Sequence, residues 1–141
     1  MLCRQIHELH AGLYPNDFQP DDKASIRALL AKVIAGKDES IFIARVDGKG
    51  VGYIWFEELG SHDGTFAKRP RRLYVNHIGV DPAYRRKGIA RRLMNRVTTE
   101  AGTRQITLDS WAANAGAHAF FESLGFEPLR ILFRRHGSLE R

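Results

Sequence analysis

Cysteine is nearly absent from this chain of 141 residues, in which Cys3 is the single example. One thiol forms no internal disulfide, so the sequence predicts a reducing, cytoplasmic location. No apolar run approaches the roughly 20 residues that a membrane-spanning helix needs, and the first residues lack the apolar segment of a secretory signal. These absences disfavour a disulfide-stapled secreted protein and a membrane protein.

The composition that remains is that of an ordinary globular domain. Hydrophobic residues make up 43% and charged residues 27% of the chain, and the length predicts one domain over residues 1–141. Lysine and arginine number 22 against 16 acidic residues, which gives a net charge of +6. This excess favours an anionic ligand, but alone it does not distinguish nucleic acid, nucleotide or acidic substrate.

The first half of the chain predicts two helices and a β-hairpin. Apolar spacing predicts a helix over residues 4–13 and an amphipathic helix that begins at a cap, Asp21 or Asp22, and ends at Gly36. Two β-rich runs, 41–46 and 51–57, flank the turn sequence Asp47-Gly48-Lys49-Gly50, so we expect them to pair antiparallel. Residues 59–70 are polar and contain glycine, which predicts a loop.

The second half predicts a strand–helix–strand unit. A strand over 73–80, a helix from about Gly88 to Ala101 and a strand over 105–111 form a βαβ unit, whose strands run parallel. A further helix is predicted between Asn114 and Gly125, and a final strand over 129–134 is expected to return along the sheet.

A concentration of cations marks the turn between the strand and the helix of this unit. The first N–H groups of a helix lack intrahelical partners and carry the positive end of its dipole, so they can hold an anion. Gly88 has no Cβ and would let a phosphate approach its amide. The turn therefore predicts a phosphate-bearing ligand, with a solvated helix face as the alternative for the basic residues, which are Arg85, Arg86, Lys87, Arg91, Arg92 and Arg96.

Two separated motifs resemble those of the GCN5-related N-acetyltransferase (GNAT) superfamily, which binds acetyl-coenzyme A. Val80-x-Pro82-x-x-Arg85-Arg86-Lys87-Gly88-Ile89-Ala90 is similar to the family's R/Q-x-x-G-x-G/A pyrophosphate loop. Trp111-x-x-Asn114-x-x-Ala117-x-x-x-Phe121-x-x-x-Gly125-Phe126 is similar to its N-x-x-A-x-x-x-Y-x-x-x-G-F segment. Both motifs in this order make coincidence improbable.

The resemblance implies a fold and a donor site. The expected fold is α/β (α+β): a mixed, mostly antiparallel sheet with a splayed central parallel pair, flanked by about four helices. Main-chain groups of Ile78 and Val80 would pair with the pantetheine arm. Asn114 would contact the ligand deeper in the cleft, and Phe121 would also contact the cofactor. The pyrophosphate loop would comprise Arg85, Arg86, Lys87, Gly88, Ile89 and Ala90.

The chain departs from the family pattern in three places. Ala90 stands at the second glycine, a replacement that leaves its amide available. The family's first strand has no counterpart ahead of the first helix, which suggests a missing or truncated edge element. Phe121 occupies the position of a tyrosine proposed to protonate the departing thiolate, and a phenyl ring has no proton to give.

Candidate acceptor-side residues follow from alternation along the strand over 73–80. Unless a bulge shifts the phase, Tyr74, Asn76, Ile78 and Val80 share one face. We predict that Tyr74 and Asn76 face the acceptor, where Tyr74 orders a water or donates a proton; aromatic packing on the sheet is the alternative for Tyr74. His77 is expected on the other face as a hydrogen-bonded core histidine.

The implied activity is direct transfer of an acetyl group from acetyl-CoA to a primary amine, of a small molecule or of a peptide or protein N-terminus. A non-catalytic acyl-CoA-binding sensor is the main alternative, which Phe121 favours. A nucleic-acid-binding module is disfavoured because no aromatic-basic stacking pattern is present. Members of the superfamily are often dimers, so a homodimer is an expectation. No metal site is predicted, since His7 and His10 have no third ligand nearby in sequence.

Overall fold

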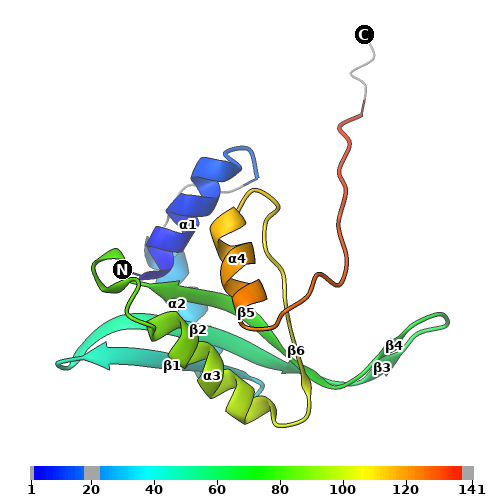
Figure 1. The fold of residues 1–141 in the computed structure, drawn as a ribbon, viewed down its shortest axis with the longest axis horizontal. Coiled ribbons are helices and arrows are strands. Elements are labelled where there is room, and N and C mark those ends of the chain that lie inside the picture. The colour runs from blue at the N-terminus through cyan, green and yellow to red at the C-terminus, as the bar shows by residue number, and fades with distance from the viewer. Residues whose placement is uncertain (1, 18–22, 138–141) are drawn as a thin grey trace.

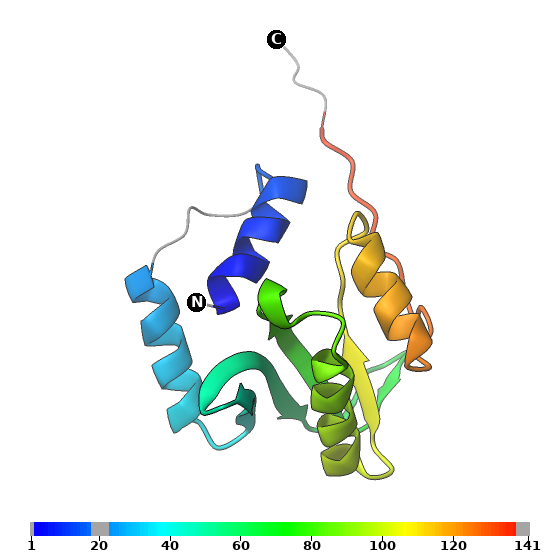
Figure 2. The same cartoon turned by 60° about the vertical axis from the view of Figure 1, so that its left-hand side comes forward.

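The computed structural model describes residues 2–17 and 23–137. A central sheet separates two helical layers: α1 and α2 lie on one face, and α3 and α4 lie on the other (Figures 1 and 2). The elements in chain order are α1 (Leu2–Leu13), α2 (Lys23–Ala35), β1 (Glu39–Val46), β2 (Lys49–Leu59), β3 (His62–Asp63), β4 (Lys68–Arg69), β5 (Arg72–Val80), the 3-10 turn η1 (Pro82–Tyr84), α3 (Ile89–Ala101), β6 (Gln105–Leu108) and α4 (Ala115–Ser123).

The main sheet has four strands in the order β1-β2-β5-β6. β1 and β5 run antiparallel to β2, whereas β5 and β6 run parallel and are joined through α3. The predicted mixed sheet, its parallel pair and the flanking helices are therefore confirmed. No helix within the described residues has the length and apolarity to cross a bilayer.

The β1–β2 hairpin follows directly from its turn sequence. Asp47 and Gly48 have φ angles of 49° and 78°, which suit the tight two-residue turns that match the twist of paired strands. Pairing continues from Val46 opposite Lys49 to Glu39 opposite Glu57. The predicted hairpin is confirmed, and it supplies the broad antiparallel half of the sheet.

The core lies between the sheet and α3. Apolar positions of α3 recur at helical spacing and meet the apolar positions of β2 and β5. Burial of these side chains, rather than helix propensity, fixes α3 against the sheet. The buried members of this cluster are Ile54, Phe56, Leu73, Val75, Leu93, Met94, Val97 and Ala101.

Both N-terminal helices form as predicted, but α2 buries little of its apolar surface. Val33 is 2% exposed, whereas Leu29 is 46% and Ile34 73% exposed. The predicted cap, Asp21 or Asp22, lies outside the described residues. The sheet therefore covers only part of the apolar face that the sequence of α2 predicts.

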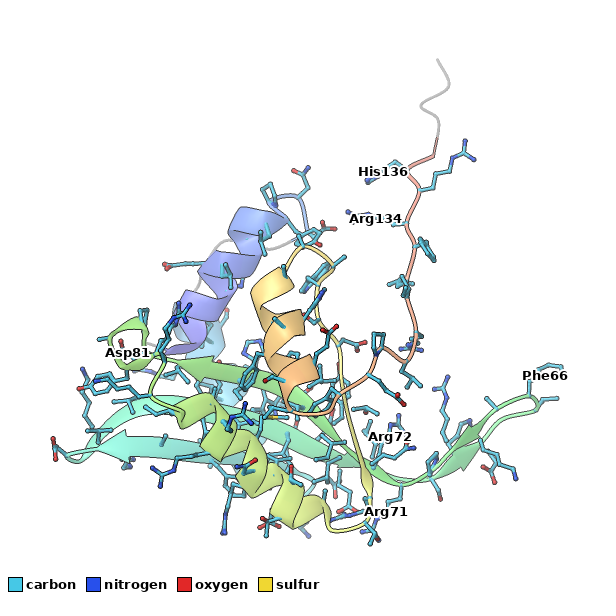
Figure 3. The ribbon with its side chains drawn as sticks, in the orientation of Figure 1. Phe66, Arg71, Arg72, Asp81, Arg134 and His136 are labelled. Atoms are coloured by element: carbon cyan, nitrogen blue, oxygen red, sulfur yellow. The ribbon has the colours of Figure 1, made fainter. Side chains whose placement is uncertain are left out.

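Residues 59–70, predicted as a loop, instead form a two-stranded ribbon. His62 pairs with Arg69 and Asp63 with Lys68. The ribbon projects from the sheet, and Phe66 lies at its tip with 99% of its surface exposed (Figure 3). The prediction failed because strands of two residues show no alternation that sequence reasoning could detect.

The predicted final strand over 129–134 is wrong. Residues 126–137 follow α4 as an extended segment that leaves the body of the domain and pairs with no strand (Figure 1). Its β-type apolar pattern is present, but Leu129, Ile131, Leu132 and Phe133 are between 72% and 96% exposed. Strand propensity therefore exists here without a neighbouring strand, because extended conformation alone does not bring a segment to a sheet edge.

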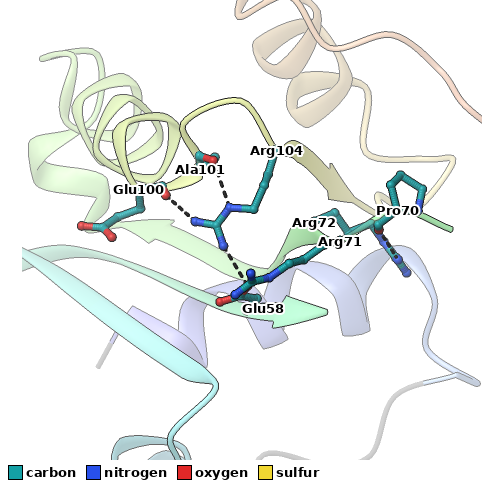
Figure 4. Close-up of polar contacts among 7 residues, drawn as sticks. All are labelled: Glu58, Pro70, Arg71, Arg72, Glu100, Ala101 and Arg104. Carbon is teal, nitrogen blue, oxygen red and sulfur yellow. Dashed lines mark hydrogen bonds and ion pairs between the residues drawn. The ribbon is translucent and has the colours of Figure 1, made fainter. Parts of the chain in front are cut away.

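An ion-pair cluster ties the ends of three elements together. Glu58, near the end of β2, pairs with Arg71 and, at 2.9 Å, with Arg104. Arg104 also donates to the carbonyl oxygens of Glu100 and Ala101 at the end of α3 (Figure 4). The hydrogen bond from Arg71 is the main reason that the pKa of Glu58 is lowered.

Replacing Glu58 by glutamine is expected to lower the free energy of unfolding at neutral pH. A depressed carboxyl pKa stabilises the fold above the ordinary value of 4.5 and loses that effect as the pH falls through the folded-state pKa. The deficit of Glu58→Gln should therefore shrink below about pH 4.5, as urea unfolding between pH 3 and 7 would measure. Glu122→Gln, at an exposed position of α4, is the control; a pH-independent deficit in Glu58→Gln would contradict the ion-pair explanation.

Candidate functional site

The parallel strands β5 and β6 pair over only part of the length of β5. β6 pairs with Arg72–Val75, whereas Asn76–Val80 continue along β2 without a described strand on their other side. A strand edge of this kind presents main-chain N–H and C=O groups to a ligand. The splay implied by the family resemblance is present, although β6 ends at Leu108 rather than at the predicted Trp111.

A β-bulge at Asn76 changes the side-chain phase of β5. Trp55 pairs with His77 and Phe56 with Val75, so Asn76 is an extra residue in β5. Val75 and Ile78 consequently both pack on the core beside α3. Uninterrupted alternation predicts that Ile78 and Val80 lie on the face of Tyr74. That prediction is wrong, because the bulge inserts one residue before them.

Three buried side-chain polar atoms in the described part of the chain lack a hydrogen-bond partner. They are Nε1 of Trp55, Nδ2 of Asn76 and Oγ1 of Thr107. Trp55 lies opposite His77, directly after the bulge, and Thr107 lies opposite Tyr74 just before it. Unpaired buried polar groups are costly and rare. Their position beside the splay is suited to a ligand that carries amide and carbonyl groups.

The turn after β5 prepares the start of α3. Asp81 Oδ1 accepts from the N–H of Ala83 at 3.0 Å, which closes η1 (Figure 3). Arg86 and Gly88 then have φ angles of 60° and 77°, a region in which glycine is unstrained. Gly88 is the N-cap of α3 and supplies no side chain to its first amides. A Cβ at Gly88 would meet no heavy atom within 4 Å outside its chain neighbours, so the space beside this N-cap is open.

The basic residues near this turn divide into two groups. Arg85, Arg86 and Lys87 are exposed on the loop itself, and Lys87 Nζ lies 5.3 Å from the ring centre of Tyr84. The arginines of α3 point elsewhere, as helix rotation requires. Arg91 donates to Ser123 of α4 at 3.4 Å, Arg96 lies 5.5 Å from the ring of Phe42, and Arg92 lines a shallow hollow beside the β1–β2 hairpin.

The second sequence motif forms the start of α4 and one side of that helix. Asn114 is the N-cap of α4, where its Oδ1 accepts from the N–H of Ala117 at 3.2 Å. The carboxamide nitrogen is thus the group left for a ligand. Phe121 is half-buried and packs edge-on against Phe126, with the ring centres 5.8 Å apart. The aromatic ring there contributes packing.

The sheet face below α1 carries a pair of polar groups that includes a predicted residue. The hydroxyl of Tyr74 donates to Asp109 Oδ2 at 2.7 Å. Burial, followed by the hydrogen bond and charge of Asp109, raises the pKa of Tyr74 to about 12. A phenol with this pKa holds its proton at neutral pH and protonates a thiolate, whose pKa is near 8.5, unfavourably. Water ordering therefore suits Tyr74 better than proton donation.

Sequence reasoning missed the partners on this face. Asp109 was included in a predicted strand and given no role, yet it follows β6 and reaches Tyr74. Tyr14, after α1, accepts a hydrogen bond from the N–H of Ala113 at 2.7 Å and packs against Trp111. The sequence did offer one signal for Asp109. This polar residue follows a strand that was predicted to run parallel to the strand carrying Tyr74, and ligands often bind at the ends of parallel strands.

His77 lies on the face of Tyr74, not on the α3 face that simple alternation gives. Its Nδ1 is 2.9 Å from the hydroxyl of Tyr53, so the expected hydrogen-bonded histidine is present.

Among the residues that the structure describes, no three His, Cys, Asp or Glu side chains come together as a metal site would need.

Comparison with known proteins agrees with this geometry. Residues 3–126 match the model of the acetyltransferase (GNAT) family. The N-alpha-acetyltransferase RimI of Mycobacterium tuberculosis is 36% identical over 92 residues, which are 65% of this chain and 53% of that protein. The N-alpha-acetyltransferase MAK3 of Arabidopsis thaliana is 36% identical over 95 residues, 65% of this chain and 47% of that protein. The chain thus spans about half the length of these curated relatives.

Solved structures share the fold of this chain. A mutant of the BH1408 protein from Bacillus halodurans superposes with a TM-score of 0.88 at 20% identity, covering 97% of this chain and 90% of that one. The aminoglycoside N-acetyltransferase AAC(6')-Iy in complex with CoA gives a TM-score of 0.64 at 23% identity, covering 82% of this chain and 90% of that one. At these identities the likeness concerns the fold.

Proposed function

Because the chain belongs to the GNAT family of acetyltransferases, we propose that it transfers an acetyl group from acetyl-CoA to a primary amine. The observation that carries this proposal is one continuous surface. The edge of β5 over Asn76–Val80 has no described strand beside it and leads through a basic turn to the start of α3, where Gly88 supplies no side-chain cap. On this edge the carbonyl oxygen of Val80 accepts from Nε of Arg85 at 3.3 Å. An extended arm that ends in a pyrophosphate matches both parts of that surface.

The donor would bind mainly through main-chain groups. Ile78 and Val80 would pair with the amides of the pantetheine arm as an added strand does. The amides of Arg85–Ala90 would hold the pyrophosphate, with the side chains of Arg85, Arg86 and Lys87 as counter-charges. The carboxamide of Asn76, whose Nδ2 is buried and unpartnered, would donate to a carbonyl group near the bulge.

The acetyl transfer itself needs few protein groups. The neutral amine attacks the thioester carbonyl carbon, so that a C–N bond forms and the C–S bond breaks. A main-chain N–H near Ile78 would stabilise the oxyanion, and water would reprotonate the thiolate. A water held by Tyr74 would carry away the proton that the amine loses. Phe121 takes no part in proton transfer, which is consistent with a leaving group of moderate pKa.

The acceptor would approach from the face below α1. The charges of Asp109 and Glu57 both raise the pKa of Tyr74, after its burial and the hydrogen bond to Asp109, whereas the charge of Arg130 lowers it. The carboxylates therefore outnumber the cation around Tyr74. A cationic acceptor, whether a small polyamine-like molecule or the N-terminus of a peptide, fits such a surface.

The single cysteine, Cys3, supports a cytoplasmic location for this activity.

Turnover of acetyl-CoA against a panel of amines tests this function. Release of free thiol should be seen with at least one acceptor among N-terminal peptides, aminoglycosides, polyamines and amino acids. Thermal stabilisation by acetyl-CoA provides a separate readout of donor binding. Stabilisation without thiol release across the panel would favour the acyl-CoA sensor, the alternative that Phe121 supports. Absence of any stabilisation by acetyl-CoA would overturn both functions.

A further inference from the structure

The β3–β4 ribbon projects from the domain and contributes nothing to its core. Its two strands are each two residues long, and every residue from Gly60 to Arg71 is exposed. A two-stranded ribbon without a packed face is at best marginally stable by itself. Packing within this chain therefore does not explain why residues 60–71 extend into solvent (Figure 3), and the ribbon is free to contact another molecule.

The tip of the ribbon combines an aromatic ring, a hollow and a cation. Phe66 is 99% exposed, and it lines a shallow hollow together with His62, Thr65, Ala67 and Arg69. A single exposed apolar side chain is ordinary on a protein surface. An apolar ring that shares a hollow with a guanidinium group, however, suits a ligand that has both apolar and anionic groups.

The returning half of the ribbon is strongly basic. Residues 59–72 contain four Lys and Arg side chains and one carboxylate, Asp63. Arg71 is neutralised by Glu58. Within the described chain, Lys68 and Arg69 have no carboxylate at ion-pair distance, and Arg72 donates only to the carbonyl oxygen of Pro70, at 3.4 Å (Figure 4). These three cations are therefore available to an anionic ligand, and they are Lys68, Arg69 and Arg72.

The cations of the ribbon lead directly into the carboxylates around Tyr74. Arg72 begins β5, and Tyr74, two residues further, lies on the same face of that strand. The hydroxyl of Tyr74 donates to Asp109 at 2.7 Å, and Tyr74 lies opposite Glu57 of β2. The surface thus changes from negative to positive between Tyr74 and the ribbon.

We propose that the β3–β4 ribbon docks the acidic segment of a polypeptide whose N-terminal amine is acetylated, an inference that rests on the proposed acetyl transfer. The amine lies at the carboxylates around Tyr74, acidic side chains lie beside Lys68 and Arg69, and an apolar side chain further along packs against Phe66. Tyr74 and Arg69 are five positions apart, which is at most about 17 Å at about 3.4 Å per residue. About five residues of an extended acceptor span that distance.

This charge pattern favours an acidic polypeptide over the other classes of ligand. A small amine fits the carboxylates around Tyr74 but is too short to reach the ribbon. A nucleic acid suits the cations of the ribbon, but its phosphates meet like charge at Asp109 and Glu57, which disfavours it at the acceptor face. A polypeptide with a cationic N-terminus and acidic residues further along complements both signs.

Acetylation of matched peptides tests the docking. Two ten-residue peptides share the first four residues of the best peptide acceptor in the amine panel and differ at the fifth and sixth positions, which are glutamate in one and glutamine in the other. The glutamate peptide should have an about tenfold higher kcat/KM, through a lower KM, because two exposed charge pairs contribute about that much. The preference should disappear in the double variant Lys68→Ser, Arg69→Ser and should shrink as salt is raised.

Arg45→Ser provides the matched control, because it removes one exposed charge at the opposite end of β1. This variant should keep the preference for the glutamate peptide. With leucine at the eighth position of both peptides, Phe66→Ser should raise the KM of the glutamate peptide about threefold, since contact with Phe66 removes part of the leucine from water. Turnover of spermidine should be the same in all of these variants.

The outcomes separate the docking from acetyl transfer. Equal kcat/KM values for the two peptides, or a preference that survives in Lys68→Ser, Arg69→Ser, would overturn the docking. A panel that yields a small amine but no peptide as acceptor would do the same and leave acetyl transfer intact, whereas thiol release with no acceptor at all would end both. Binding of single-stranded oligothymidylate that the double variant abolishes, without a peptide preference, would identify the ribbon as a nucleic-acid site instead.

Discussion

Replacing Gly88 by leucine is expected to weaken the binding of coenzyme A about a hundredfold. The space around a Cβ at Gly88 is open and the first amides of α3 have no side-chain cap from this residue. In the proposed donor site, a leucine side chain would occupy the volume that the pyrophosphate needs. Loss of two charge-assisted hydrogen bonds at about 1.5 kcal/mol each amounts to about 3 kcal/mol, or roughly a hundredfold in the dissociation constant. Calorimetric titration with CoA would measure it.

Gly102 provides a matched control at the other end of the same helix. Gly102 also has a positive φ, 59°, and no atom within 4 Å of an added Cβ. Leucine at Gly88 strains the backbone by about 1–2 kcal/mol, because this residue has left-handed helical angles. Gly102, with φ 59° and ψ −115°, lies outside the regions that side chains other than glycine readily adopt, so both variants should lose thermal stability, Gly102→Leu the more. Only Gly88→Leu should lose affinity for CoA. Equal affinities in the two variants would place the pyrophosphate elsewhere.

Replacing Tyr74 by phenylalanine is expected to lower kcat about a hundredfold, the lower end of what positioned proton transfer contributes. The phenol oxygen would hold the water that accepts the amine proton, whereas the phenyl ring keeps the packing. The KM for acetyl-CoA should change little, because the donor would bind along the edge of β5 and at the start of α3. Steady-state kinetics with a saturating acceptor separate these effects, and an unchanged kcat would remove Tyr74 from the site.

Asp109→Asn separates the chemistry of this pair from its packing. Burial is the largest cause of the raised pKa of Tyr74, about 12, followed by the hydrogen bond and the charge of Asp109. The neutral amide should therefore lower that pKa part of the way towards its ordinary value of about 10. Ultraviolet titration of the phenols would follow the change, with Tyr74→Phe identifying the signal. Activity that depends on a protonated Tyr74 would then decline at a lower pH in Asp109→Asn than in the unchanged protein.

Sequence reasoning succeeded where local signals were strong and agreed with one another. The Asp47-Gly48 turn between two β-rich runs specified the hairpin, and the apolar spacing of α3 between two strands specified the parallel pair. Cations, a glycine and a helix start coincide between Arg85 and Ala90, and the structure starts α3 at Ile89 with Gly88 as its N-cap; that this loop holds a pyrophosphate stays a prediction. Asn114 was expected to contact a ligand, and the structure places its Oδ1 in the N-cap of α4.

Features that depend on distant parts of the chain were not accessible from the sequence. The bulge at Asn76 depends on how β5 pairs with β2, and the residues of β5 alone do not indicate it. The contact between Tyr74 and Asp109 joins positions 35 residues apart. Residues 129–134 have the composition of a strand, but the path of the chain after α4 decides whether a segment reaches a sheet edge, and these residues pair with no strand of the described sheet.

The bulge at Asn76 also keeps the second half of β5 in phase with the core. If every residue of β5 paired with β2 in regular alternation, all residues after Asn76 would shift by one position, because side chains alternate every second residue. Ile78 would then point away from α3, and His77 would face the apolar core. Deletion of Asn76 would instead leave Val75, His77 and Ile78 opposite Phe56, Trp55 and Ile54 in regular register, so it would remove the buried carboxamide and keep the phase of the core.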